Sequence, residues 1–115
     1  MEIHVSGRQL RKAMENEDSC RRQYGAAMTK KVMLRLAVLR AADSLAVFWP
    51  PKSGPERCHE LKGDLAGVFS IDRMHPYRLL FKARDEAPPL DRRDEQQRWR
   101  AITSIEIVAV EDTHG

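Results

Sequence analysis

Two histidines, a lysine and an arginine are the side chains best suited to proton and phosphate chemistry in this sequence. His59 and Lys62 lie in the run HELKGD, Arg78 follows in HPYRLLF, and His114 belongs to the terminal run DTHG. Imidazole exchanges protons near neutral pH, and fixed cations neutralise a phosphate whose negative charge grows in the transition state. If the fold gathers these four groups, they have the chemistry needed to cleave RNA without a metal ion.

Each of these residues also has an ordinary structural explanation. A histidine in a strand is more often a surface or hydrogen-bonded residue than a catalyst. The triplet Lys62-Gly63-Asp64 can be a simple turn, because Gly takes positive φ and Asp bonds to nearby backbone. Arg78 alternates with apolar neighbours, a position that suits either a site or an ion pair. The functional interpretation therefore requires that the four side chains meet.

The first half of the chain predicts one strand followed by helices. Residues 2–5 alternate and end at Ser6-Gly7, residues 9–14 fit a short helix, and Asp18 or Ser19 can cap a second one. That second helix has a possible interruption at Gly25 and continues to about Leu45. Its apolar face comprises Met28, Val32, Leu36 and Leu39, widened by Leu34, Val38, Ala41 and Leu45. Three prolines in residues 50–55 must end the helix.

The second half changes to a period of two, which predicts strands. Phe69 and Ile71 share a face, and His75-Pro76 marks a tight reversal. In the following strand Tyr77, Leu79 and Phe81 point one way and Arg78, Leu80 and Lys82 the other. Residues 84–100 carry five bases and five acids with two prolines, so we expect a mobile charged loop. Residues 102–110 are apolar on both faces, which indicates a central strand.

Length, composition and charge limit the number of domains and the classes of protein that fit this sequence. The 115 residues suit one domain, 1–115, and the 42% hydrophobic content argues against disorder. No apolar run reaches the ~18 residues of a membrane span and the N-terminus lacks a leader pattern, so we expect a cytoplasmic protein without membrane contact. Cys20 and Cys58 are isolated, which favours buried thiols over a zinc site. The net charge of +3 suits a phosphate-rich partner only weakly.

Strand, two or possibly three helices, then three strands is the order of an α+β fold. With the motifs at 57–64, 67–70 and 75–81, it resembles the RelE/ParE superfamily of toxin–antitoxin toxins. The HigB-type plasmid maintenance killer branch is the most similar. The resemblance covers nearly the whole chain. It implies a RelE-like fold, in which the helices pack on one face of a mostly antiparallel four-stranded sheet.

The same resemblance implies a function and a set of site residues. The function is that of a ribosome-dependent mRNA endonuclease without a cofactor or metal, held inactive by a HigA-like helix-turn-helix antitoxin. The matched catalytic positions are His59, Lys62, Arg78 and His114, supported by Asp112 and Thr113. Thr113 departs from the family pattern, which has tyrosine there. Apart from the resemblance, the basic residues Lys30, Lys31, Arg35 and Arg73 are candidates for contacts with ribosomal or messenger RNA, although basic residues on a helix are by default a solvated face.

Two other functions fit the same resemblance. A catalytically weak or inactive relative would keep the fold and only bind a helix-turn-helix antitoxin, an alternative that Thr113 leaves open. A ParE-like inhibitor of DNA gyrase would share the architecture but would not need the His59, Lys62, Arg78 and His114 set.

Overall fold

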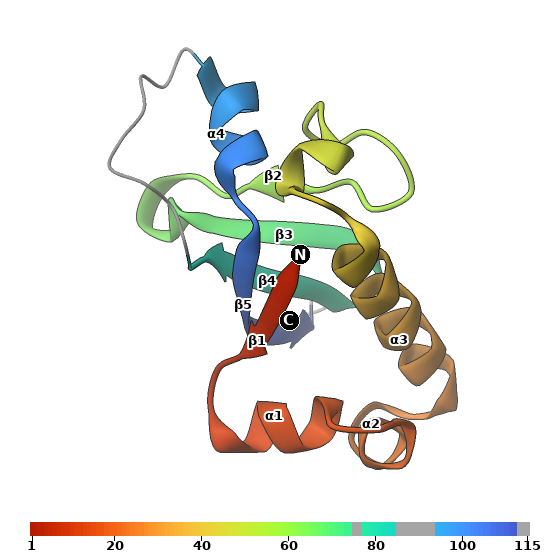
Figure 1. The fold of residues 1–115 in the computed structure, drawn as a ribbon. Coiled ribbons are helices and arrows are strands. Elements are labelled where there is room, and N and C mark those ends of the chain that lie inside the picture. Colours follow the sequence, from red (N-terminus) through yellow and green to blue (C-terminus); the bar gives the residue numbers. More distant parts are fainter. Residues whose placement is uncertain (75–76, 85–93, 113–115) are drawn as a thin grey trace.

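The computed structural model describes residues 1–74, 77–84 and 94–112 (Figure 1). The elements follow the order expected from the sequence, a strand, then helices, then strands, with the short strand β2 and the helix α4 in addition. In chain order they are β1 (Glu2–Val5), α1 (Arg8–Met14), α2 (Glu17–Tyr24), α3 (Ala26–Ala41), the 3-10 turn η1 (Leu45–Phe48), β2 (His59–Glu60), the 3-10 turn η2 (Gly63–Leu65), β3 (Val68–Met74), β4 (Tyr77–Ala83), α4 (Glu95–Ala101) and β5 (Ser104–Asp112).

The sheet has the strand order β1-β5-β4-β3-β2. Only the β1–β5 pair is parallel among these strands; the other pairs are antiparallel. The expectation of four strands was one short, because the two-residue strand β2 is too brief to produce a periodic pattern. The prediction that β5 is central is confirmed, since it lies between β1 and β4.

The core lies between the helices and one face of the sheet. From the strands it takes Phe69, Ile71, Leu79, Phe81, Ile105 and Ile107, all of them fully buried. Because successive side chains of a strand point to opposite faces, Ser70, Asp72, Arg78, Leu80 and Lys82 lie on the other face. We call this second face the open face of the sheet; Ser70 and Leu80 are buried within it, whereas Lys82 is exposed.

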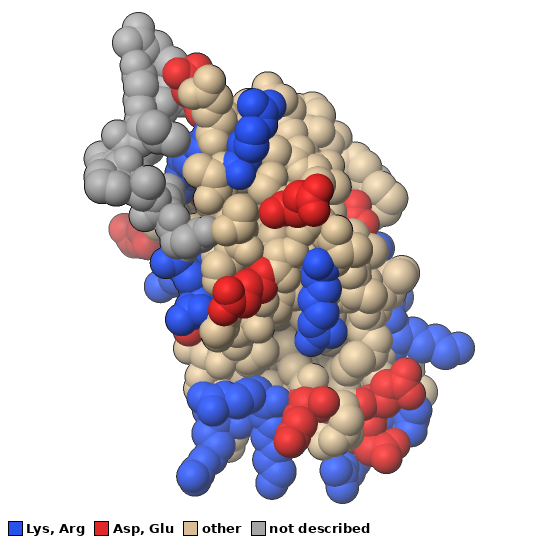
Figure 2. All heavy atoms as spheres, viewed as in Figure 1, with Lys and Arg blue, Asp and Glu red and all other residues tan. Residues whose placement is uncertain are grey.

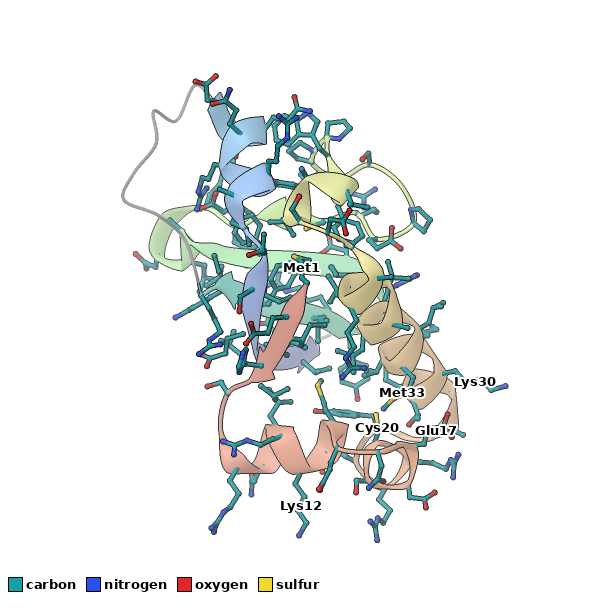
Figure 3. The ribbon with its side chains drawn as sticks, in the orientation of Figure 1. Met1, Lys12, Glu17, Cys20, Lys30 and Met33 are labelled. Carbon is teal, nitrogen blue, oxygen red and sulfur yellow. The ribbon has the colours of Figure 1, made fainter. Side chains whose placement is uncertain are left out.

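Helices α2 and α3 are separate, as the glycine between them suggested. Gly25 has φ +85°, a backbone conformation that side-chain-bearing residues rarely adopt, and Asn16 rather than Asp18 or Ser19 caps α2 by accepting from the Ser19 N–H. Cys20 and Met33 lie between the two helices (Figure 3). The predicted apolar face of α3 is buried, but Leu34 is 54% exposed and the helix ends at Ala41, four residues early.

Helix α4 corrects the prediction of a mobile loop over residues 84–100. Residues 85–93 lie outside the described residues, whereas Glu95–Ala101 forms a helix. Its Trp99 is fully buried and meets Trp49 and Phe69 edge to face, with ring centroids 5.1 and 5.6 Å away. One large aromatic side chain thus attaches a polar helix to the core.

Within the described ranges, no helix is long and apolar enough to cross a bilayer.

Candidate functional site

His59 is carried by the edge strand β2 and lies on the open face. It pairs directly with Ser70 of β3, so the two side chains project from the same side of the sheet. The preceding residue, Cys58, points the opposite way and is fully buried in the core. Core packing of Cys58 therefore fixes the direction in which His59 leaves the strand. The His59 side chain is 14% exposed.

The ring of His59 is held through its Nδ1 atom. This atom lies 2.9 Å from the carbonyl oxygen of Arg57 and 3.7 Å from Oδ2 of Asp72. The second oxygen of Asp72, Oδ1, accepts a hydrogen bond from the Ser70 hydroxyl. His59 Nε2 has no hydrogen-bond partner among the residues that the structure describes.

Lys62 lies two residues beyond β2, immediately before η2, and its side chain is exposed. Lys62, Gly63 and Asp64 form the turn that was the ordinary structural explanation for this triplet, and Gly63 has φ +67°. The Lys62 ammonium makes no ion pair with any described residue.

Arg78 projects from β4 onto the open face and is paired there with Glu111 of β5. Its Nε and Nη2 atoms donate to Glu111 Oε1 at 3.1 and 2.6 Å. The ordinary ion pair considered from the sequence is therefore present, and it neutralises the cation in the free protein. Strand β3 separates β2 from β4, and the register aligns His59 with Ser70 and then with Leu80. Arg78 is therefore two residues along β4 from the position opposite His59, and the two backbones lie roughly 12 Å apart.

Strand β5 ends at Asp112, beside the first residue of β4. Asp112 pairs with Tyr77, so the chain leaves the sheet beside the residue that precedes Arg78. Thr113 and His114 lie outside the described residues, as does the side chain of Asp112. That His114 reaches His59 therefore stays a prediction.

The four residues proposed to bind RNA occupy different settings. Lys30 and Lys31 are exposed on α3, and Lys30 extends away from the helix (Figure 3). Arg35 is 13% exposed and pairs with Glu56 at 3.6 Å, which ties α3 to the segment before β2. Arg73 lies in β3, and its side chain is outside the described residues. Arg35 is thus engaged in an internal contact rather than presented to solvent.

A basic groove between α1, α2 and β5 escaped the sequence analysis. It encloses about 1160 Å³ and has no Asp or Glu in its lining. Arg8, Lys12 and Arg22 supply its charge, and Val108–Val110 of β5 form its apolar side. Figure 2 shows Lys and Arg side chains gathered at the α1 end of the molecule. Their clustering depends on the α1–α2 packing, so residue spacing alone did not indicate it. None of the lining residues belongs to β2 or β3, and the groove is separate from His59.

The two cysteines are free and buried, as expected. Burial, with the carboxylates of Glu56 and Asp72 nearby, raises the pKa of the Cys58 thiol far above its ordinary value. Cys58 is therefore a protonated core residue at neutral pH and no nucleophile. In the described part of the chain, no three His, Cys, Asp or Glu side chains converge to hold a metal ion.

No family model matches the chain, and no curated protein matches it. Two solved structures do. One is the YoeB-YefM complex from Staphylococcus aureus, at 20% identity and a TM-score of 0.54, covering 96% of this chain and 94% of that one. The other is the YoeB/ParE toxin from Agrobacterium tumefaciens, at 13% identity and a TM-score of 0.55, covering 97% and 98%. The chain therefore has the fold of these toxins, and the RelE-like fold expected from the sequence is confirmed.

Proposed function

We propose that this protein is the toxin of a type II toxin–antitoxin module and cleaves mRNA on the ribosome by metal-independent acid–base chemistry. Its fold, shared over nearly the full length with YoeB-type and ParE-type toxins, supports the toxin assignment. Within the RelE/ParE superfamily, the motifs around His59, Lys62 and Arg78 favour the HigB branch. No cofactor is part of the proposal.

The observation that carries the nuclease assignment is the setting of His59. An imidazole with a free Nε2 lies on the open face of a YoeB-like sheet, and the unpaired ammonium of Lys62 follows three residues later. A general base must be within hydrogen-bond reach of the proton that it takes, and an imidazole held through one ring nitrogen keeps the other nitrogen for that contact.

The reaction is attack of an RNA 2′-OH on the adjacent phosphorus. The O2′–H bond breaks and its proton passes to one histidine, while the O2′–P bond forms and the P–O5′ bond breaks. The leaving 5′-oxygen takes a proton from the other histidine. The products are a cyclic 2′,3′-phosphate, which can open to a 3′-phosphate, and a 5′-OH. His59 and His114 are the two histidines of this scheme, and each proton transfer is worth about 10²–10⁴-fold in rate.

Lys62 and Arg78 stabilise the pentacoordinate phosphorane. The planar guanidinium of Arg78 suits two phosphate oxygens, and binding them requires it to exchange Glu111 for the phosphate. Asp112 orients His114 or holds the terminal residues in place. Thr113 stands where an aromatic residue would stack on a base, so substrate placement here relies on other contacts.

Ribosomal and messenger RNA are the proposed macromolecular ligands. The exposed cations Lys30 and Lys31 on α3, together with Arg73, provide phosphate contacts. The basic groove adds Arg8, Lys12 and Arg22. Before it reaches the ribosome, the toxin is held by an antitoxin. The Staphylococcus aureus relative was solved as a complex of YoeB with YefM, and we propose a HigA-like helix-turn-helix protein for this chain.

Expression of the chain alone in bacteria tests the proposal. The expected result is growth arrest with mRNA cut inside translated regions, relieved by co-expression of the cognate antitoxin. Arrest without mRNA cleavage would contradict the nuclease assignment.

Two alternatives remain distinguishable in the same experiment. A ParE-like gyrase inhibitor, suggested by the ParE label of the Agrobacterium tumefaciens relative, would arrest growth even after substitution of His59, Lys62, Arg78 and His114. An inactive module that only binds an antitoxin would cause no arrest.

A further inference from the structure

The contacts of the His59 ring indicate which ring nitrogen carries the proton in the neutral imidazole. Nδ1 lies 2.9 Å from the Arg57 carbonyl oxygen, which can only accept a hydrogen bond. The neutral imidazole must therefore donate from Nδ1, and its lone pair is on Nε2, the nitrogen without a described partner. The tautomer of a neutral histidine is set by the hydrogen bonds of its ring nitrogens, so the contact with the Arg57 carbonyl fixes His59 as the Nδ1–H tautomer.

The Arg57 carbonyl is aimed at the ring by an uncommon backbone conformation. Arg57 has φ +49°, in the left-handed region that residues other than glycine seldom adopt. Non-glycine residues in this region are held by their surroundings, and such positions cluster at functional sites. Here the neighbouring Glu56 is fixed twice, by its ion pair with Arg35 and by its carbonyl, which accepts the Asp72 N–H at 3.3 Å.

Asp72 provides the second half of the network. Its Oδ2 lies 3.7 Å from the same Nδ1, and its Oδ1 is occupied by the Ser70 hydroxyl. The carboxylate is too far for a strong bond to the neutral ring, but it places a negative charge beside the imidazolium that forms when Nε2 takes a proton. The carbonyl thus fixes the tautomer, and the carboxylate faces the charged form.

We propose that the Arg57 carbonyl and Asp72 are a positioning pair that makes His59 the proton acceptor of the reaction. The 2′-OH proton passes to Nε2, Nδ1–H stays on the Arg57 carbonyl, and Asp72 balances the positive charge. The departing 5′-oxygen then receives its proton from the other histidine, so the acid and base roles are assigned. This assignment rests on the proposed ribonuclease function, but the geometry of the ring is testable without it.

Nitrogen chemical shifts of the His59 ring, measured on the free full-length protein, test the geometry. The expected spectrum is that of an Nδ1–H tautomer in the neutral state, assigned by its loss in His59→Gln. A predominant Nε2–H tautomer, or an average of the two, would overturn the proposal whether or not the protein cleaves RNA.

Asp72→Asn tests the carboxylate in the ribosome cleavage assay. The amide keeps the shape and can still accept from Ser70, but it carries no charge. We expect kcat to fall roughly tenfold to hundredfold, a part of the ~10²–10⁴-fold that a positioned proton acceptor contributes, with KM unchanged and partial rescue in Asp72→Glu. Asp72→Asn that unfolds like wild type and cleaves at the wild-type rate would remove Asp72 from the pair.

A matched pair of variants tests the carbonyl. Arg57→Gly and Arg57→Val both remove the guanidinium, but only glycine adopts φ +49° without strain, whereas a β-branched residue disfavours it. We expect kcat of Arg57→Val to be at least about tenfold below that of Arg57→Gly, with loss of the preset tautomer only in the valine variant. Equal kcat values and equal ring spectra for the two would refute the role of the carbonyl. If wild type shows the preset tautomer but cleaves no RNA, the function fails and the geometry stands.

Discussion

Arg78 shows how a single residue can serve the free and the bound state differently. In the free protein its guanidinium is satisfied by Glu111, and the pair is only partly shielded from water, with 24% and 43% of the two side chains exposed. Such a pair contributes roughly 0–1 kcal/mol, so a phosphate can replace the carboxylate at small cost. The protein thus keeps a cation on the open face without leaving it unpaired.

Glu111→Gln removes the negative charge that neutralises Arg78 and keeps the length of the side chain at position 111. We expect affinity for single-stranded RNA to rise by up to about fivefold, because the phosphate no longer competes with a carboxylate, and the free energy of unfolding to fall by about 1 kcal/mol or less. Equilibrium binding and urea unfolding measure the two effects. Glu106→Gln makes the same charge change elsewhere on β5; an equal rise in affinity there would show that only net charge matters.

Cys58 gives a pH dependence with a definite sign. Its pKa in the folded protein is raised by burial and by Glu56 and Asp72, so above the ordinary value of 9.0 the unfolded chain loses a proton that the folded chain keeps. The Cys58 contribution to stability is therefore complete below pH 9 and declines as pH rises, by about 1.4 kcal/mol per pH unit. Urea unfolding under reducing conditions from pH 8 to 10.5 should show a steeper decline for wild type than for Cys58→Ala. Parallel curves for the two proteins would contradict this.

Helix α4 is the element for which the sequence pattern and the structure differ most. Five of its seven residues are charged or carry an amide, which predicts a solvated segment, and they provide too little apolar periodicity to indicate a helix. The helix is stabilised instead by the burial of the Trp99 side chain against Trp49 and Phe69. An ion pair between Arg98 and Glu60 then joins α4 to β2, the strand that carries His59.

Removal of the Trp99 side chain should destabilise the folded protein. Trp99→Ala is expected to lower the free energy of unfolding by about 3–5 kcal/mol, since it empties a fully buried aromatic site. The control is Gln97→Ala, an exposed position in the same helix, for which we expect a change within about 0.5 kcal/mol. Urea denaturation of both variants measures the difference. A small loss in Trp99→Ala would mean that α4 is docked by other contacts.

Residue patterns predicted the long elements well and the short or contact-dependent ones poorly. The stripe Met28, Val32 and Leu36 located α3 because buried faces repeat along a helix. The alternation around Arg78 correctly placed it on the face opposite Leu79. The two-residue strand β2 and the Arg57 conformation leave no such pattern, because pairing with β3 and packing of the preceding segment determine them. The Arg35–Glu56 pair is likewise set by contacts between segments distant in sequence.

At the scale of the whole molecule, two sets of cations lie outside the His59 network. Exposed lysines lie along α3, and three cations line the groove between α1, α2 and β5. The net charge of +3 is small, so the local arrangement rather than the total must attract a polyanion. Binding through phosphates should accordingly be strongly salt-dependent.

Lys30→Gln tests whether α3 contacts RNA. Loss of one phosphate contact should weaken ribosome association and reduce the slope of log K against log salt by about 0.7–0.9, because one fewer counterion is released. Arg21→Gln is the matched control, since Arg21 already pairs with Glu17 and Asp18 at 3.7 and 3.2 Å. The α3 contact would be rejected if the two variants gave the same slope as wild type.

The most direct measurement is a map of mRNA 5′ ends in a purified translation reaction containing the wild-type protein or His59→Gln. The account predicts new ends bearing a 5′-OH with wild type, and cleavage at least about 10²-fold slower with the variant, while both proteins unfold at similar urea concentrations. An uncut message with wild type, ends bearing a 5′-phosphate, or equal rates for the two proteins would contradict it.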